Sequence, residues 1–234
     1  MTPRLRNGRR KPGLAAAGFR NAQRIRLPPE QGAGGCFCLA RGTGRHMQAE
    51  NCFIVTGGPG SGKTTLLTHL GVQGLHVMPE AGRAIIQAQM AIDGPAVPWG
   101  DRALYAELML SWELRAYSEA AALAGPVLFD RGLPDILGYL ALEGLATPAH
   151  LRRAAEAWRY NTDVFIAPPW REIFHQDRER RQEFSTAERT YEAMRRVYSG
   201  LGYRLIELPR APVAERAGFV QAQILAQIQT LRGG

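Results

Sequence analysis

The chain contains very little lysine. Its 29 basic residues include two lysines, Lys11 and Lys63, and all the others are arginines. Outside the arginine-rich N-terminal segment, Lys63 is the one position where a compact ammonium group replaces a guanidinium. Because the two cations are not interchangeable where a site has a tight geometry, Lys63 marks a candidate site that requires lysine.

Cysteine and long apolar runs are scarce as well. The three cysteines are an odd number, and Cys36 and Cys38 are separated by a single residue, so the sequence predicts neither a disulfide framework nor a zinc site. This usage favours a reducing, cytoplasmic location. No apolar run approaches the length of about 18 residues that a transmembrane helix needs, so we expect no membrane span.

Acidic residues are nearly absent from the first 46 positions. Residues 1–46 contain ten Lys and Arg and one acid, Glu30, and therefore carry +9, whereas the remaining 19 basic and 20 acidic residues give a net charge of −1. A segment rich in Gly, Pro, Ala and Arg cannot bury a core, so we expect disorder over 1–46 and a folded domain over 47–234. Nucleic-acid binding is expected only through the basic segment, if at all.

Three interpretations of this N-terminal segment stay open. It is a translated extension with Met47 as the natural first residue, a basic arm for nucleic acid or acidic membranes, or an organellar targeting peptide. The first is favoured because Met47 stands just before the first predicted strand. A targeting peptide is usually rich in serine, and residues 1–46 contain none.

The segment around Lys63 fits the phosphate-binding loop G-x-x-x-x-G-K-[ST]. A β-branched apolar run over 52–56 precedes it, and leucines at helical spacing follow it, so the loop joins a strand to a helix. A Gly-rich turn that matches by chance is the alternative, and it explains neither the flanking elements nor the lysine and the hydroxyl. The loop residues expected to bind a triphosphate are Gly57, Gly58, Pro59, Gly60, Ser61, Gly62, Lys63, Thr64 and Thr65.

Within this loop the residues have different expected roles. Successive backbone amides at the start of a helix form an anion site, which Lys63 extends toward the β- and γ-phosphates. The Thr64 hydroxyl is a candidate ligand of Mg²⁺, and Thr65 is expected to bond an inner phosphate. The sequence therefore predicts binding of ATP or GTP with Mg²⁺.

Strands and helices alternate along the rest of the chain. This alternation predicts an α/β fold of three layers, the P-loop NTPase fold, with a five-stranded parallel sheet covered by helices on both faces. Ligands of such sheets bind at the carboxyl ends of the strands. The expected strands are 52–56, 75–78, 127–129, 164–167 and 203–208, and the expected later helices are 81–90, 101–124, 134–142, 147–160, 187–198 and 213–231.

Charged residues follow two of these strands directly. Asp130 ends the third apolar run and is a candidate Mg²⁺ ligand, or alternatively a cap of the next helix. Its neighbour Arg131 either clamps a phosphate or pairs with Asp135 as part of the scaffold. Glu80, after the second strand, is either the general base for an acceptor hydroxyl or an acid favoured by the helix dipole. Arg83 lies one turn further on.

The most charged stretch of the domain lies between the fourth and fifth strands. Arg178 and Arg181 are three residues apart and share a face if the segment is helical. One interpretation is a solvated surface. The favoured one is a mobile lid whose arginines neutralise charge on a transferred phosphoryl group.

Taken together, these motifs resemble the small AAA-type predicted ATPases, a family related to the ribosylnicotinamide kinase domain of NadR. The resemblance covers residues 50–230 and implies an ATP- or GTP-binding, kinase-like fold. More distantly, the acids after the second and third strands resemble those of deoxynucleoside and thymidylate kinases, which implies Glu80 as base and Asp130 with Arg131 at the metal and phosphates. The segments that carry the family resemblance are 57–65, 79–83, 129–132 with Asp135, 168–170 and 177–182.

Two functions remain in competition. The leading hypothesis is a Mg²⁺-dependent phosphotransferase that moves the γ-phosphoryl of ATP to a small hydroxyl-bearing acceptor, because Glu80, Asp130 and the two arginines are more than a binding module needs. The alternative is a nucleotide-dependent switch with little turnover. No Asp-Glu pair closes the third strand and no arginine-finger segment is evident, so a hexameric remodelling motor is not expected.

Overall fold

The computed structural model of the chain describes residues 47–174 and 183–233. The core of the domain is a five-stranded sheet in which all neighbouring strands are parallel, in the order β3-β4-β2-β6-β7. This confirms the predicted fold class. The strands are β2 (Cys52–Gly57), β3 (His76–Met78), β4 (Val127–Asp130), β6 (Asp163–Ala167) and β7 (Arg204–Glu207).

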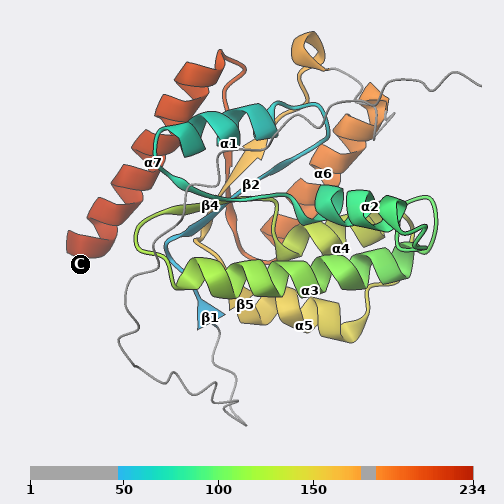
Figure 1. Cartoon of the computed structure of the whole chain (residues 1–234). Coiled ribbons are helices and arrows are strands. Elements are labelled where there is room, and N and C mark those ends of the chain that lie inside the picture. The colour runs from blue at the N-terminus through green and yellow to red at the C-terminus, as the bar shows by residue number, and fades with distance from the viewer. Residues whose placement is uncertain (1–46, 175–182, 234) are drawn as a thin grey trace, which may run out of the picture. The chain divides into compact units, whose positions relative to one another are not determined.

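Helices cover both faces of this sheet (Figure 1). On one face, α1 (Lys63–Val72) and α7 (Val213–Gly233) pack against alternate side chains of the strands, such as Phe53 and Phe165. The other face carries a larger core with the remaining helices, of which α4 and α6 lie closest together. The remaining helices are α2 (Ala81–Ala91), α3 (Arg102–Ala121), α4 (Leu133–Leu142), α5 (Ala149–Ala157) and α6 (Phe184–Gly200).

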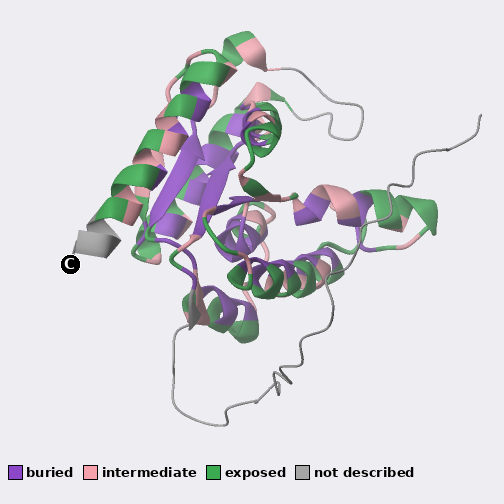
Figure 2. Ribbon diagram, turned by 60° about the vertical axis from the view of Figure 1, so that its left-hand side comes forward, coloured by how far each residue is buried: buried purple, intermediate pink, exposed green. Residues whose placement is uncertain are grey.

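The central strands are buried on both faces. Every residue of β2, β4 and β6 is buried, whereas β3 and β7 at the sheet edges are partly exposed (Figure 2). Continuous apolar runs are expected for parallel strands covered on both sides, which is why 52–56 and 164–167 were recognisable without alternation. Among the described residues, no helix is long and apolar enough to cross a membrane.

One predicted helix end is wrong. The sequence predicts a helix to residue 160, but α5 ends at Ala157 and is followed by β5 (Trp158–Arg159), which pairs in parallel with β1 (Met47–Gln48). The Ala49 amide extends this pairing by donating to the Arg159 carbonyl at 2.9 Å. A partner strand over a hundred residues away therefore overrides the local helical preference.

The other helices match their predicted positions within a few residues. The Asp101 side chain caps α3, because its Oδ1 accepts a hydrogen bond from the Leu104 amide at 2.9 Å. The parallel arrangement places the carboxyl ends of β2, β3 and β4 at one edge of the sheet, where the phosphate loop begins.

Candidate functional site

The phosphate loop connects β2 to α1 through glycines that no other residue could replace without strain. Gly57 has φ 130°, and a Cβ there would lie 2.5 Å from the Ala167 carbonyl oxygen. Gly62, the N-cap of α1, has φ 76° in the left-handed region. Because Gly62 has no side chain to cap α1, the first amides of that helix are available to an anion.

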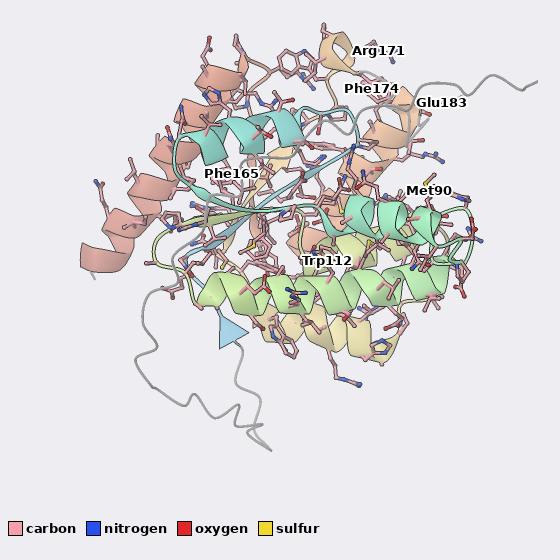
Figure 3. All side chains as sticks on the ribbon, in the orientation of Figure 1. Met90, Trp112, Phe165, Arg171, Phe174 and Glu183 are labelled. Carbon is pink, nitrogen blue, oxygen red and sulfur yellow. The ribbon has the colours of Figure 1, made fainter. Side chains whose placement is uncertain are left out.

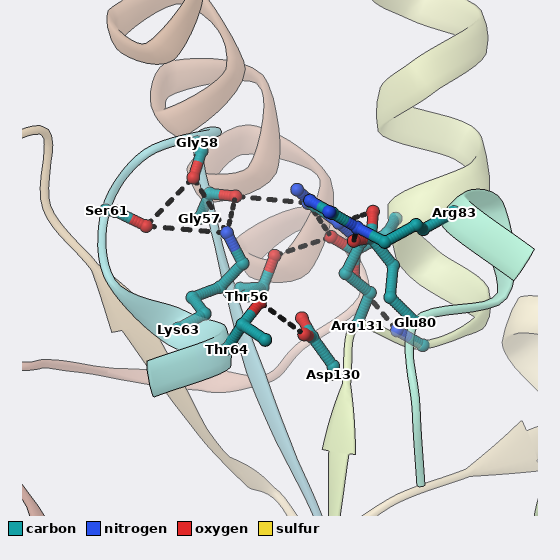
Figure 4. A network of polar contacts seen from close by, with 12 residues as sticks. Thr56, Gly57, Gly58, Ser61, Lys63, Thr64, Glu80, Arg83, Asp130 and Arg131 are labelled. Atoms are coloured by element: carbon teal, nitrogen blue, oxygen red, sulfur yellow. Dashed lines mark hydrogen bonds and ion pairs between the residues drawn. The ribbon is translucent and has the colours of Figure 1, made fainter. Parts of the chain in front are cut away.

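Lys63 points back into the curled loop (Figure 4). Its Nζ donates hydrogen bonds to the carbonyls of Gly57 at 3.0 Å and Gly58 at 2.7 Å, and it lies 3.4 Å from Ser61 Oγ. The side chain is buried, and burial, followed by the nearby Arg131 charge, lowers the pKa of Lys63 to about 7. A bound phosphate would favour the charged ammonium and raise this pKa.

Thr64 and Asp130 bring two oxygen ligands together beside Lys63. The Thr64 hydroxyl lies 3.4 Å from Asp130 Oδ2, while Asp130 Oδ1 is fully buried and has no hydrogen-bond partner among the described residues. Burial raises the pKa of Asp130, and the positive charge of Lys63 opposes that shift. A hydroxyl and a carboxylate with an unused oxygen are the kind of ligands that Mg²⁺ prefers, so the donor set fits this ion.

Arg131 is the residue that joins the phosphate loop to the rest of the site. Its Nε donates to Glu80 Oε1 at 3.1 Å, and its Nη1 donates to the Gly57 carbonyl at 3.1 Å and to Asp135 Oδ1 at 3.2 Å (Figure 4). Its φ of 76° is unusual for a residue with a side chain, and such strain is common at functional sites. Burial lowers the pKa of Arg131, but the carboxylates of Glu80, Asp135 and Asp130 more than offset this and raise it.

Two alternatives from the sequence are clarified by these contacts. Arg131 does pair with Asp135, as the scaffold interpretation expects, and a contact with phosphate stays a prediction. Glu80 is the N-cap of α2, yet its side chain makes no capping hydrogen bond and turns instead toward Arg131. Its second oxygen lies 3.9 Å from Arg83 Nε.

Asp135 organises the base of the site, and its partners other than Arg131 were not recognisable from the sequence. It accepts hydrogen bonds from the Thr56 hydroxyl at 2.6 Å, from the Gly132 amide at 3.0 Å and from the Tyr198 hydroxyl. These partners come from β2, the β4–α4 turn and α6. Asp135 therefore connects the end of β2, where the phosphate loop begins, to α4 and α6 on the face of the sheet with the larger core.

A second unpredicted contact supports the loop from the other face of the sheet. The guanidinium of Arg216 in α7 donates to the carbonyl of Ser61 at 3.2 Å and to that of Gly62 at 3.4 Å. Arg216 is buried, and burial lowers its pKa. An arginine in a helix otherwise packed on an apolar core was the sequence signal that could have indicated this role.

A cavity of about 170 Å³ adjoins the phosphate loop and is enclosed by α2, α3, α4 and α6. Pro59 and Glu80 line it at the loop, and the sequence indicated neither the cavity nor the buried acid Glu113 that lines it. Glu113 is only 4% exposed, and its Oε2 has no hydrogen-bond partner among the described residues. The spacing of Tyr105, Met109 and Glu113 on one face of α3 could have indicated it, because an acid follows two core residues there.

The structure describes only the flanks of the predicted lid. Arg178 and Arg181 lie outside the described residues, and their roles stay predictions. The flanks of that segment lie close together, with Arg171, Phe174 and Glu183 gathered at the same end of the domain (Figure 3). The ring centroids of Phe174 and Phe184 are 5.4 Å apart, and the Arg171 guanidinium lies 4.2 Å from the centroid of Phe184.

The structure thus brings most of the predicted site residues to one edge of the sheet. The loop residues Gly57 to Thr65 adjoin Glu80, Asp130 and Arg131, with Thr65 exposed in the first turn of α1. Ser61 closes the loop by donating its hydroxyl to the Gly58 carbonyl at 2.8 Å. Gly60, at φ 69°, packs under the ring of Phe174.

Solved structures with similar folds include several kinases. A crystal structure of NadR protein in complex with NR has a TM-score of 0.52 and 18% identity, covering 70% of this chain and 45% of that chain. Thymidylate kinase from Ehrlichia chaffeensis has a TM-score of 0.52 and 14% identity, covering 77% and 99%. Deoxyadenosine kinase from M. mycoides has a TM-score of 0.49 and 13% identity, covering 75% and 99%.

At these identities the likeness shows the fold alone, and this chain spans less than half the length of the NadR chain. The comparison with curated proteins gives no match. The family described as AAA domain matches residues 52–216, which include the phosphate loop, the acidic strand ends and Arg216. The chain therefore belongs to this AAA domain family and has a kinase-like P-loop fold.

Proposed function

We propose that the protein is a phosphotransferase that moves the γ-phosphoryl group of ATP or GTP to a hydroxyl of a small acceptor bound in the cavity. The observation that carries this proposal is the position of Glu80. This carboxylate lines the cavity, and through Arg131 it is linked to the Gly57 carbonyl of the phosphate loop. A proton acceptor and a phosphate-binding loop therefore face one enclosed space.

The roles of the residues follow from their contacts. The loop amides and Lys63 bind the β- and γ-phosphates, and Thr64 with Asp130 would hold Mg²⁺. When bound, that ion neutralises charge on the phosphate oxygens. The acceptor oxygen forms a bond to the γ-phosphorus while the bond from that phosphorus to the β,γ-bridging oxygen breaks. The hydroxyl proton passes to Glu80, and the nucleoside diphosphate leaves.

Arg131 has two functions in this scheme. It orients Glu80 toward the cavity, and its positive charge lies beside the site where negative charge develops on the transferred group. The arginines Arg178 and Arg181 of the predicted lid would add further positive charge. An acceptor bound in the cavity would displace water, which competes with it for the phosphoryl group.

The test is incubation of the full chain with γ-labelled ATP, MgCl₂ and a panel of nucleosides, other ribosylated compounds and simple alcohols. We expect label to appear in an acceptor, and Glu80→Gln to lower that transfer by about 10²- to 10⁴-fold, as for loss of a general base. A matched control is Glu107→Gln, which changes an exposed carboxylate of α3 outside the cavity.

Two results would contradict the proposal. Hydrolysis of ATP without transfer to any acceptor would indicate an ATPase. Tight nucleotide binding with neither transfer nor hydrolysis, together with nucleotide-dependent protease sensitivity around residues 175–182, would support the switch instead.

A further inference from the structure

The cavity has two chemically different ends. Its acidic end lies against the phosphate loop, where Glu80, Arg131 and Asp135 are joined by hydrogen bonds. Its aromatic end is formed by Tyr105 and Tyr139, whose ring centroids are 5.3 Å apart at an interplanar angle of 76°. An occupant of the whole cavity must therefore combine a polar part near the phosphates with a flat, less polar part further away.

Glu113 belongs to the acidic end. Burial raises its pKa well above the ordinary value, and Asp135, Asp130 and Glu80 raise it further while Arg131 lowers it. Burial raises the pKa of Tyr139, and the charges that act on it further are those of Glu143 and Tyr105, which raise the pKa, and Arg102, which lowers it. Because Tyr105 and Glu113 are eight residues apart on one helix face, about 12 Å separates them along α3.

No hydrogen bond or ion pair to a described residue accounts for the burial of the Glu113 side chain. Its Oε2 is completely buried without a hydrogen bond to any described residue, whereas the neighbouring carboxylates of Glu80 and Asp135 are paired. An unpaired buried carboxyl group lowers stability, and a leucine at this position of α3 would pack without that cost. A costly polar group that lines a cavity indicates a ligand contact.

We propose that Glu113 accepts a hydrogen bond from a second hydroxyl of the acceptor, which makes the acceptor a ribosyl compound with its flat ring at Tyr105 and Tyr139. This inference rests on the proposed phosphotransfer. A ribosyl group carries several hydroxyls, so one can be phosphorylated beside Glu80 while another reaches Glu113. A carboxyl oxygen accepts from a hydroxyl whether or not the group is protonated.

The buried Tyr139 hydroxyl has no hydrogen-bond partner among the described residues and is available to a polar atom on a ring bound at the aromatic end.

The experiment measures binding separately from catalysis. Calorimetry and thermal shift of the full chain with MgATP analogues use cytidine, uridine, adenosine and ribosylnicotinamide, each with its 2′-deoxy and 3′-deoxy counterparts where these exist. We expect wild type to bind at least one ribosyl compound about tenfold or more tightly than a deoxy counterpart. Loss of one hydrogen bond that leaves a buried polar group unsatisfied corresponds to a factor of this size.

Three variants identify Glu113 as the source of that preference. Glu113→Leu should reduce ribosyl affinity about 10- to 100-fold and bring the ribosyl-to-deoxy ratio close to one, while raising the melting temperature. Glu113→Gln keeps an accepting oxygen and should preserve part of the ratio. Glu107→Gln on the same helix should leave both affinity and ratio unchanged.

The outcomes separate this inference from the proposed function. Transfer of phosphate only to a non-ribosyl alcohol, or an unchanged ratio in Glu113→Leu, would overturn the role of Glu113 and leave phosphotransfer standing. Ribosyl binding that depends on Glu113 without any phosphotransfer would support the contact and count against the kinase. A lower melting temperature for Glu113→Leu would assign Glu113 to the fold and also overturn the inference.

Discussion

The phosphate loop and the cavity beside it differ in whether their buried polar groups have hydrogen-bond partners within the protein. In the loop, the side chains of Lys63 and Ser61 donate hydrogen bonds to backbone carbonyls of the loop itself. Arg216 of α7 donates to two further carbonyls of the loop. In the cavity, Glu113 and Tyr139 keep buried oxygens with no partner among the described residues. The chain thus shapes the loop with its own groups, whereas the cavity walls present groups whose partners a ligand would supply.

Arg131 is the connection between the two regions, and removing it should have the largest effect. Arg131→Met leaves Glu80 and Asp135 buried without their cation, so the free energy of unfolding should fall by about 3–5 kcal/mol in denaturant titrations. The control is Arg102→Met, which removes an exposed pair with Glu143 and should cost less than about 1 kcal/mol. Equal losses in the two variants would show that Arg131 does not hold the regions together.

Lys63 tests whether the loop needs a compact ammonium. Lys63→Met should reduce phosphotransfer by about 10²- to 10³-fold, as for loss of a preorganised cationic donor. Lys63→Arg should reduce phosphotransfer nearly as much. The space there fits a single ammonium nitrogen, 3.0 Å from the Gly57 carbonyl oxygen and 2.7 Å from that of Gly58. Steady-state kinetics with ATP measures both, and activity of Lys63→Arg within tenfold of wild type would contradict this account.

The same contrast explains how much could be predicted from the sequence. Gly57 to Thr65, Glu80, Asp130 and Arg131 could be predicted to lie together because each adjoins an apolar strand, and local pattern determines strand ends. Contacts made only in the folded domain were not found. Thr56 meets Asp135 and Arg216 meets Ser61 across long stretches of sequence, and no local pattern identifies the partner of either residue.

Errors in the predicted elements have the same origin. The helix predicted to residue 160 ends at Ala157 because β1, far away in the chain, pairs with Trp158 and Arg159. Glu113 was overlooked because a charged residue in a long helix is usually exposed. Its spacing from Tyr105 and Met109 places Glu113 on their face of α3, but its burial depends on how α3 packs over the sheet.

Asp130 belongs to the loop by position but resembles the cavity residues in having an unpaired oxygen. Asp130→Asn should leave the stability of the nucleotide-free protein unchanged or higher, because burial already disfavours the charged form. Nucleotide affinity should fall about 10- to 100-fold in MgCl₂ and little in EDTA, as measured by calorimetry. An equal loss in EDTA would mean that Asp130 supports the loop and not a metal ion.

The smallest effect is a pH dependence that distinguishes Glu113 from the paired acids. Its pKa is raised in the folded protein by burial and by Asp135, Asp130 and Glu80, although Arg131 opposes them. Above about pH 4.5 the folded state therefore binds more protons than the unfolded state, and stability falls as pH rises through the folded pKa.

Glu113→Gln and Glu113→Leu both abolish this titration, so their stability relative to wild type should grow with pH from about 4.5 upward. The gain is on the order of 1 kcal/mol and cannot exceed about 1.4 kcal/mol per pH unit. Denaturant midpoints at a series of pH values measure it. A difference that stays constant with pH would mean that Glu113 titrates alike in both states, as expected only if its carboxyl group were solvated or paired in the folded cavity.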